Sequence, residues 1–142
     1  MDRLVEDEAN RKLLIKFLEQ QELPFVVAIS KGRKRSVEQN KLQRLWINEI
    51  APQWGMAAEE VRGYCKLTIG VPILRAANET FREQYDRILK PLGYEAKIAL
   101  MMEPLDLPVT RIMTSKQKAE YLDQIYKHFT NKGLKLTLPE AA

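Results

Sequence analysis

Basic side chains gather at two places in this chain of 142 residues, whose net charge is +4. Residues 31–44 hold six Lys and Arg residues against one acidic residue, and residues 111–135 hold six against two. The chain outside these two windows is net negative. Charge segregated in this way favours a positive face that meets an acidic or phosphate-bearing partner.

The first window opens with four cations, Lys31, Arg33, Lys34 and Arg35, in a predicted loop that leads into a helix. Backbone N–H groups and the helix dipole make a helix start favourable for anions and unfavourable for cations. Each cation placed there costs some tenths of a kcal/mol, which a bound phosphate would relieve. A loop of Lys and Arg residues that only faces solvent is the simpler alternative.

The predicted contact surface continues along the helix that follows. Asn40 forms helices poorly and has no capping duty there, so we expect its amide to contact phosphate, sugar or a base edge. Gln39 could do the same, but its spacing from Ser36 predicts a capping box that starts the helix. Two further cations on the helix, Lys41 and Arg44, are predicted to belong to this surface. Three from the second window are predicted to complete it: Arg111, Lys116 and Lys118.

Few residues in this sequence are suited to catalysis. Cys65 is the only cysteine and His128 the only histidine, which excludes intrachain disulfides and Cys-His zinc sites. We expect Cys65 to be a small buried hydrophobe and His128 to lie at the surface. The acidic residues show no metal-ligand spacing, and a Gly-rich phosphate loop is absent. The sequence therefore predicts no metal, no cofactor and no enzyme activity.

The elements that position the basic residues are predicted to form one α+β domain over residues 1–142, mostly helical, with a small β-sheet. Residues 25–29 are apolar and β-branched, which is typical of a strand buried on both faces, and residues 1–5 are its expected partner. Periodicity predicts helices over 7–21, from Ser36 to Pro52, over 57–68, from Asn78 to the stop at 91–93, and from Thr114 to a point just before Gly133. Residues 94–102 fit a strand or a helix, and 109–113 a short extended piece.

Capping and helix-breaking residues are expected to set the ends of these helices. Asp7 and Asn78 are expected N-caps, and Thr114 with Gln117 forms a second capping box. Pro52 is expected to end the helix that begins at Ser36. Gly70 and Pro72 are expected to break the chain after the third predicted helix, and Gly133 to follow the last one.

Tryptophan and tyrosine rings offer a second kind of nucleic-acid contact, because bases stack on them. Trp46 shares a helical stripe with Leu42, Leu45 and Ile50, so we expect it to anchor the helix in the core. Trp54 lies in a polar segment with a glycine and is the better candidate for an exposed ring. Tyr121 lies off the apolar stripe of its helix and is expected to be more open to solvent.

One pattern in the sequence resembles a known family. Arg35-Ser36, Gln39-Asn40 and Leu45-Trp46 resemble the hallmark of the NinB family of lambdoid phages, also called Orf. The segments on either side also resemble the family. They are the apolar stretch 24–29 before the pattern and, after it, the Thr114-Ser115 helix start and Gly133. Their order and spacing match those of the family across most of 23–136. Residues 55–105 match only in length and helical character, and the first twenty residues depart most.

The resemblance implies a recombination mediator. Such proteins bind single-stranded DNA, interact with the host single-strand-binding protein and help to load a strand-annealing or strand-exchange protein, as dimers. A bacterial cytoplasm is the expected location, since no apolar run in the chain is long enough to cross a membrane. Two alternatives stay open: an adaptor whose basic face binds an acidic peptide of a single-strand-binding protein, and, less favoured, a metal-dependent nuclease.

Overall fold

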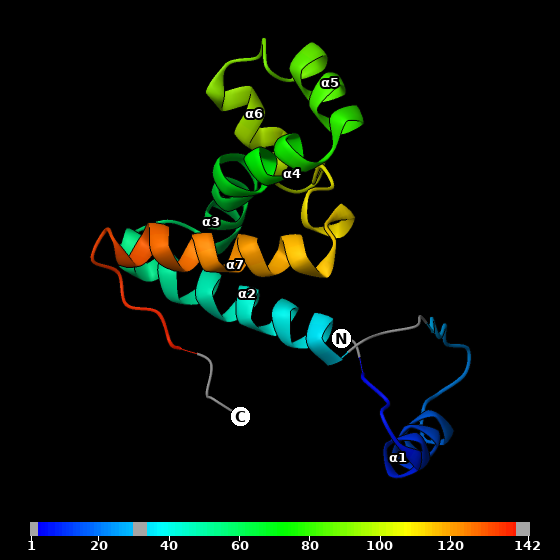
Figure 1. The fold of residues 1–142 in the computed structure, drawn as a ribbon. Helices are drawn as coiled ribbons and strands as arrows, with labels where there is room; N and C mark the ends of the chain where they lie inside the picture. Colours follow the sequence, from blue (N-terminus) through cyan, green and yellow to red (C-terminus); the bar gives the residue numbers. More distant parts are fainter. Residues whose placement is uncertain (1–2, 30–33, 139–142) are drawn as a thin grey trace.

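The protein is an assembly of helices in the computed structural model, which describes residues 3–29 and 34–138, with backbone alone for residues 34–37 (Figure 1). The helices are α1 (Glu8–Glu19), α2 (Lys34–Trp54), α3 (Ala58–Cys65), the π-helix η1 (Lys66–Gly70), α4 (Val71–Ala77), α5 (Glu79–Ile88), α6 (Tyr94–Met101), the 3-10 helix η2 (Thr110–Ile112) and α7 (Ser115–Thr130). None of these helices is both long and apolar enough to pass through a lipid bilayer.

The predicted α+β class is wrong for the described part of the chain, which contains no β-strand. Residues 25–29 were predicted to be buried, yet Val26 is 98% and Ile29 90% exposed. A strand needs a neighbour for its backbone hydrogen bonds. Within the predicted neighbour, the Arg3 guanidinium lies over the Phe17 ring of α1 instead, 4.3 Å from its centroid. The apolar run therefore has β-propensity without a partner strand among the described residues.

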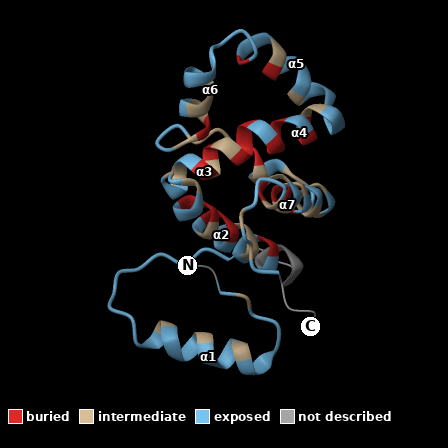
Figure 2. Ribbon diagram, turned by 90° about the vertical axis from the view of Figure 1, so that its left-hand side faces the viewer, coloured by how far each residue is buried: buried red, intermediate tan, exposed pale blue. Residues whose placement is uncertain are grey.

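Helix α1 lies apart from the other helices (Figures 1 and 2). Its predicted N-cap is confirmed, since the Asp7 carboxylate accepts a hydrogen bond from the Asn10 amide at 2.8 Å. No residue of α1 is buried, and Phe17 on its predicted inner face is 41% exposed. The amphipathic pattern thus predicted the helix correctly but not its burial.

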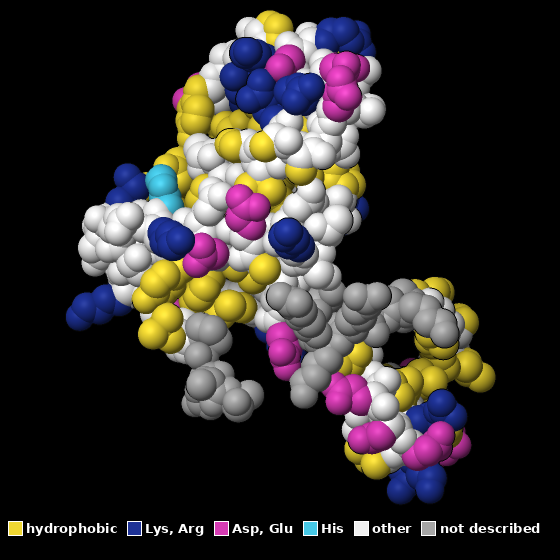
Figure 3. Space-filling view, in the orientation of Figure 1, with side chains coloured by type: hydrophobic (Ala, Val, Ile, Leu, Met, Phe, Trp, Pro, Cys, Tyr) yellow, Lys and Arg dark blue, Asp and Glu magenta, His cyan; other side chains and the backbone are white. Residues whose placement is uncertain are grey.

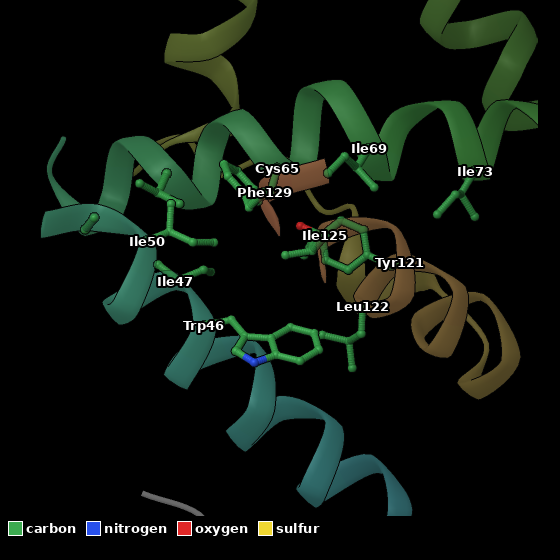
Figure 4. Close-up of a cluster of buried hydrophobic side chains, with 12 residues drawn as sticks. Trp46, Ile47, Ile50, Cys65, Ile69, Ile73, Tyr121, Leu122, Ile125 and Phe129 are labelled. Carbon is green, nitrogen blue, oxygen red and sulfur yellow. The ribbon is translucent and has the colours of Figure 1, made fainter. Parts of the chain in front are cut away.

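The main core lies where α2, α3 and α7 meet (Figure 4). Trp46 and Ile50 of α2 are 4% and 0% exposed, which confirms Trp46 as a core anchor. Its indole Nε1 also donates to the Thr137 carbonyl at 2.7 Å, so the C-terminal segment is held against α2. Leu45, predicted on the same stripe, is 43% exposed and does not belong to the core.

Two aromatic residues have environments opposite to those predicted. Tyr121 is fully buried, because α7 contacts α2 and also η1 and α4, so the covered stripe of α7 is broad enough to include it. Trp54 is half-buried, with its ring 4.9 Å from Tyr64 and 5.1 Å from Phe129 in edge-on contacts. It ends α2 instead of lying in an open loop.

The buried hydroxyl of Tyr121 is the basis of a stability prediction. Within the described chain this oxygen has no hydrogen-bond partner, and burial raises the pKa of the phenol. An unpaired buried hydroxyl costs about 1–3 kcal/mol. We expect Tyr121→Phe to leave the free energy of unfolding unchanged or to raise it by about 1 kcal/mol. Urea denaturation measures this, and a loss of more than 1 kcal/mol would mean that the hydroxyl is paired.

The expected stops at Pro52, Gly70 and Pro72 are also wrong. Helix α2 continues through Pro52 to Trp54 and ends before Gly55, whose φ is +66°. Gly70 keeps helical dihedrals, and Pro72 occupies the start of α4, where a missing N–H is tolerated. A Cβ on Gly70 would approach Val109 Cγ1 to 2.7 Å, so the glycine allows close packing there and does not break the helix.

A second core joins η1, α4, α5 and α6 with the segment that precedes α7. Residues 94–101 form a helix, and 110–112 form a turn of 3-10 helix instead of the expected extended piece. Asn78 caps α5 as predicted, accepting from the Phe81 amide at 2.9 Å. These helices position the 102–113 segment that carries one side of the candidate site.

A network of charged groups fixes the 102–113 segment to α3 and η1. Lys66 is 2% exposed, and its Nζ donates at 2.7 Å to both the Met101 carbonyl and the Asp106 carboxylate. Arg62 donates to Asp106 at 2.9 Å and forms two 2.7 Å hydrogen bonds to Glu59. Burial lowers the pKa of Lys66, whereas its hydrogen bond to Asp106 holds the pKa of that carboxyl below its usual value.

We predict that Asp106→Asn destabilises the fold by about 3 kcal/mol, because it leaves the Lys66 ammonium buried without a counterion. The wild type should lose the stabilisation from the Asp106–Lys66 ion pair in acid, when Asp106 becomes protonated. Since the folded pKa of Asp106 is below the unfolded one, the stabilisation is complete above the unfolded pKa of about 3.9 and is lost as pH falls through the folded pKa. Unfolding curves at neutral and acid pH test this, with the exposed Asp123→Asn as control. Equal losses in both variants would contradict the role of Asp106.

Candidate nucleic-acid interface

A polar cavity of about 270 Å³ lies where the first turn of α7 meets the N-terminal half of α2. Its walls come from three elements: Gln39 and Asn40 from α2, Thr110 and Arg111 from η2, and Ser115 and Lys118 from α7. Figure 1 shows α7 lying along α2, with the start of α7 above the N-terminal half of α2. Residues 70 or more positions apart in sequence are therefore brought together by helix packing.

The start of α7 is built as the sequence predicted. Thr114 is the N-cap, and its hydroxyl accepts from the Gln117 amide at 3.1 Å while Gln117 Oε1 accepts from the Thr114 amide at 2.9 Å. This confirmed capping box uses two of the helix-start donors. The other first-turn N–H groups of a helix lack acceptors within it and favour an anion nearby.

Gln39 has a different role from the predicted one. Helix α2 begins at Lys34, so Ser36 lies inside the helix and cannot be its N-cap. The predicted capping box between Ser36 and Gln39 is therefore wrong. Gln39 is only 9% exposed, and its Nε2 donates to the Ser115 carbonyl at 3.1 Å. This hydrogen bond joins α2 to the first residue of α7 and so fixes one wall of the cavity.

Lys118 and Asn40 contact each other across the cavity wall. The Lys118 ammonium donates a short hydrogen bond to Asn40 Oδ1, which orients the amide so that Nδ2 is left as a donor. Lys118 is half-buried, and this burial lowers the pKa of its ammonium group. A partly desolvated cation and an oriented N–H group thus occupy the same wall.

Arg111 supplies the second positive charge of the cavity. Its side chain is exposed, and its guanidinium reaches the Asp106 carbonyl only at 3.5 Å. No carboxylate of the described residues lies within ion-pair distance of Arg111 or Lys118. The cavity therefore presents two cations and several N–H donors, an arrangement that suits an oxyanion such as phosphate.

The structure brings together only some of the sequence-predicted site residues. Asn40, Arg111 and Lys118 line the cavity, whereas Lys41, Arg44 and Lys116 are exposed on α2 and α7 outside it. Lys31 and Arg33 lie outside the described residues. For Lys34 and Arg35 the backbone lies in α2 and the side chains are not described. On the face shown in Figure 3, the described Lys and Arg side chains form one group at the top of the view and are otherwise scattered among acidic ones, so they form no continuous band.

Sequence reasoning did not single out Thr110, Met113 or Ser115 as lining residues. Their types are unremarkable for a binding site, and only the capping box at Thr114 marks this point of the chain as a helix start. The cavity depends on how η2 turns in front of α7, which no local pattern indicates.

Two other titratable groups lie away from the cavity. Cys65 is fully buried, as predicted, and burial raises the pKa of its thiol to about 12. His128 is half-buried instead of lying at the surface, and its Nε2 pairs with the Tyr64 hydroxyl at 2.9 Å. Burial and the nearby Lys132 lower the pKa of His128. In the described ranges, no group of three or more His, Cys, Asp or Glu side chains is placed to hold a metal ion.

Comparison of the chain with protein-family models, with curated proteins and with solved structures finds no match.

The burial of Lys118 leads to a prediction about stability. A half-buried ammonium without a carboxylate is unfavourable for folding, so Lys118→Met should leave the free energy of unfolding unchanged or raise it. Lys127→Met is the matched control, because Lys127 is exposed and pairs with Asp123 at 2.9 Å, a contact worth at most about 1 kcal/mol. Thermal or urea unfolding compares the two. A clear loss of stability in Lys118→Met alone would show that this lysine serves the fold.

Proposed function

We propose that this chain is a non-catalytic, single-stranded-DNA-binding mediator of recombination, similar to the NinB family. The observation that carries the proposal is the cavity between α2 and α7, where Arg111 and Lys118 lie together without a neutralising carboxylate among the described residues. Two cations left unpaired beside a helix start suit a phosphate group of a nucleic acid.

In this proposal the DNA is held mainly through its backbone. The cavity receives one phosphate, and the exposed Lys41 and Arg44 of α2 contact further phosphates along the strand. The basic residues at 31–35 lead into the same helix in sequence and extend the contact surface. Phosphate contacts carry little sequence information, so the preference among base sequences should be weak.

The partners of the proposed mediator follow from the resemblance. They are the host single-strand-binding protein and a strand-annealing or strand-exchange protein, in the cytoplasm of a bacterial host. We further propose a homodimer, for which the exposed apolar side chains of Leu23, Val26 and Ile29 offer a surface that a second copy could cover.

An adaptor function is the second candidate, and the same cavity supports it. An acidic peptide would present carboxylates to Arg111 and Lys118 as a DNA strand presents phosphates. Titration with an oligonucleotide and with an acidic peptide, each alone and in competition, separates the two functions. Peptide binding without any DNA binding would replace the mediator proposal, and metal-dependent cleavage of the oligonucleotide would overturn the non-catalytic assignment.

The salt dependence of DNA binding tests the phosphate contacts. Each neutralised phosphate on a single strand contributes about −0.7 to the slope of log affinity against log salt. Because the cavity receives one phosphate, we expect the double variant Arg111→Gln with Lys118→Gln to bind more weakly and to flatten this slope by about 0.7. Fluorescence anisotropy with an unphosphorylated oligonucleotide at several salt concentrations measures both quantities.

The matched control is Arg87→Gln with Lys90→Gln, which removes the same charge at the end of α5, beyond α4 and away from the cavity (Figure 1). Its slope should stay close to that of the wild type. A second pair, Arg33→Gln with Arg35→Gln, tests the basic residues at 31–35, the last two of which belong to α2. If the cavity variant and the control change the slope equally, the cavity is not the contact site.

A further inference from the structure

The charged and polar groups of the cavity are matched to a dianion. Besides the Arg111 guanidinium and the Lys118 ammonium, the wall offers the Asn40 amide, whose oxygen is already engaged by Lys118 and whose Nδ2 is therefore the free end. The Gln39 amide nitrogen is engaged by the Ser115 carbonyl. Arg111 and Lys118 are the two charged side chains of this lining, so the cavity holds two positive charges and no negative one.

A phosphate inside a DNA strand carries one negative charge, whereas a phosphate at the end of a strand is a monoester. A monoester carries between one and a half and two negative charges near pH 7 and has three acceptor oxygens, as a phosphorylated side chain does. Two cations and oriented N–H donors are better satisfied by the monoester, since every added charge-assisted hydrogen bond offsets part of the desolvation of Lys118.

The size of the cavity also suits the end of a strand. A volume of about 270 Å³ is several times the roughly 30 Å³ that one water molecule occupies, so it admits a phosphate together with part of its nucleotide. Met113 lines the same space and supplies an apolar, adaptable contact for a sugar or a base. An ion of phosphate size alone would leave most of this volume to water.

We propose that the cavity between α2 and α7 is a seat for the terminal phosphomonoester of a DNA strand, with Arg111, Lys118 and Asn40 as its phosphate ligands. This inference rests on the proposed single-strand binding and adds to it a preference for phosphorylated strand ends. Inorganic phosphate and mononucleotides share the same chemistry and should bind more weakly, because they lack the contacts that the rest of the strand makes with α2.

The test compares oligonucleotides of one sequence that carry an internal fluorophore and differ only at the ends: hydroxyl at both ends, a 5′ phosphate, or a 3′ phosphate. A circular strand of the same length has no ends. We expect one of the phosphorylated forms to bind on the order of tenfold more tightly than the unphosphorylated form, as one additional charged hydrogen bond predicts. The advantage should shrink at pH 5, where the monoester loses its second charge.

The variants Arg111→Gln and Lys118→Gln should remove this advantage, whereas Arg87→Gln with Lys90→Gln should keep it. If a cavity variant misfolds, NMR titration of the wild-type protein still tests whether a phosphomonoester binds in the cavity. Thymidine 5′-monophosphate should shift the amide signals of Ser115 and Asn40 more than thymidine does.

The outcomes separate this inference from the proposed function. If all linear and circular strands bind equally, the strand-end preference is wrong and single-strand binding stands. If none of them binds, the proposed function fails. Two further results would overturn the assignment of the cavity. One is a tighter binding of phosphorylated strands that persists in both cavity variants. The other is NMR signal changes with inorganic phosphate when no phosphorylated strand binds more tightly than the unphosphorylated one.

Discussion

The packing of α7 between α2 and the run α3-η1-α4 is the interaction on which the rest of the structure depends. Tyr121, Ile125 and Phe129 are each fully buried, and they follow one another along the buried stripe of α7 (Figure 4). Buried aromatic and branched side chains of this size each contribute several kcal/mol when their space is well filled. Because α7 is covered on two sides, its first turn has little freedom to move relative to α2. The Gln39 hydrogen bond to Ser115 fixes the remaining orientation at the end where the cavity lies.

The candidate site is a consequence of this packing and of two polar arrangements around it. The capping box at Thr114 starts α7 at a fixed residue, and the Lys66, Asp106 and Arg62 network holds the segment that carries Arg111. A half-buried Lys118 without a carboxylate partner in the described chain is unfavourable for stability alone. Such an arrangement is typical of sites where a ligand supplies the missing charge.

The sequence predicted the helices more reliably than their environments. Helical periodicity and capping residues placed α1, α5 and α7 well, because Asp7, Asn78 and Thr114 act locally. The predicted sheet failed because β-propensity cannot say whether a partner strand exists, and Val26 is left almost fully exposed. Tyr121 was misplaced because a single apolar stripe assumes one packing partner, whereas α7 has two. For the candidate site, charge clustering indicated Arg111 and Lys118, and the poor helix propensity of Asn40 indicated that residue. Neither signal could show that they meet in one cavity, since that depends on contacts between distant helices.

The central claim is that a single DNA strand contacts the cavity between α2 and α7. Photo-crosslinking of a strand that carries a reactive nucleotide at one defined position, followed by mass spectrometry of the crosslinked peptides, tests it most directly. The account predicts crosslinks to peptides that contain residues 39–44 and 110–118, reduced by an excess of unlabelled strand. Crosslinks confined to α5, α6 or the N-terminal segment, with none at the cavity, would contradict it.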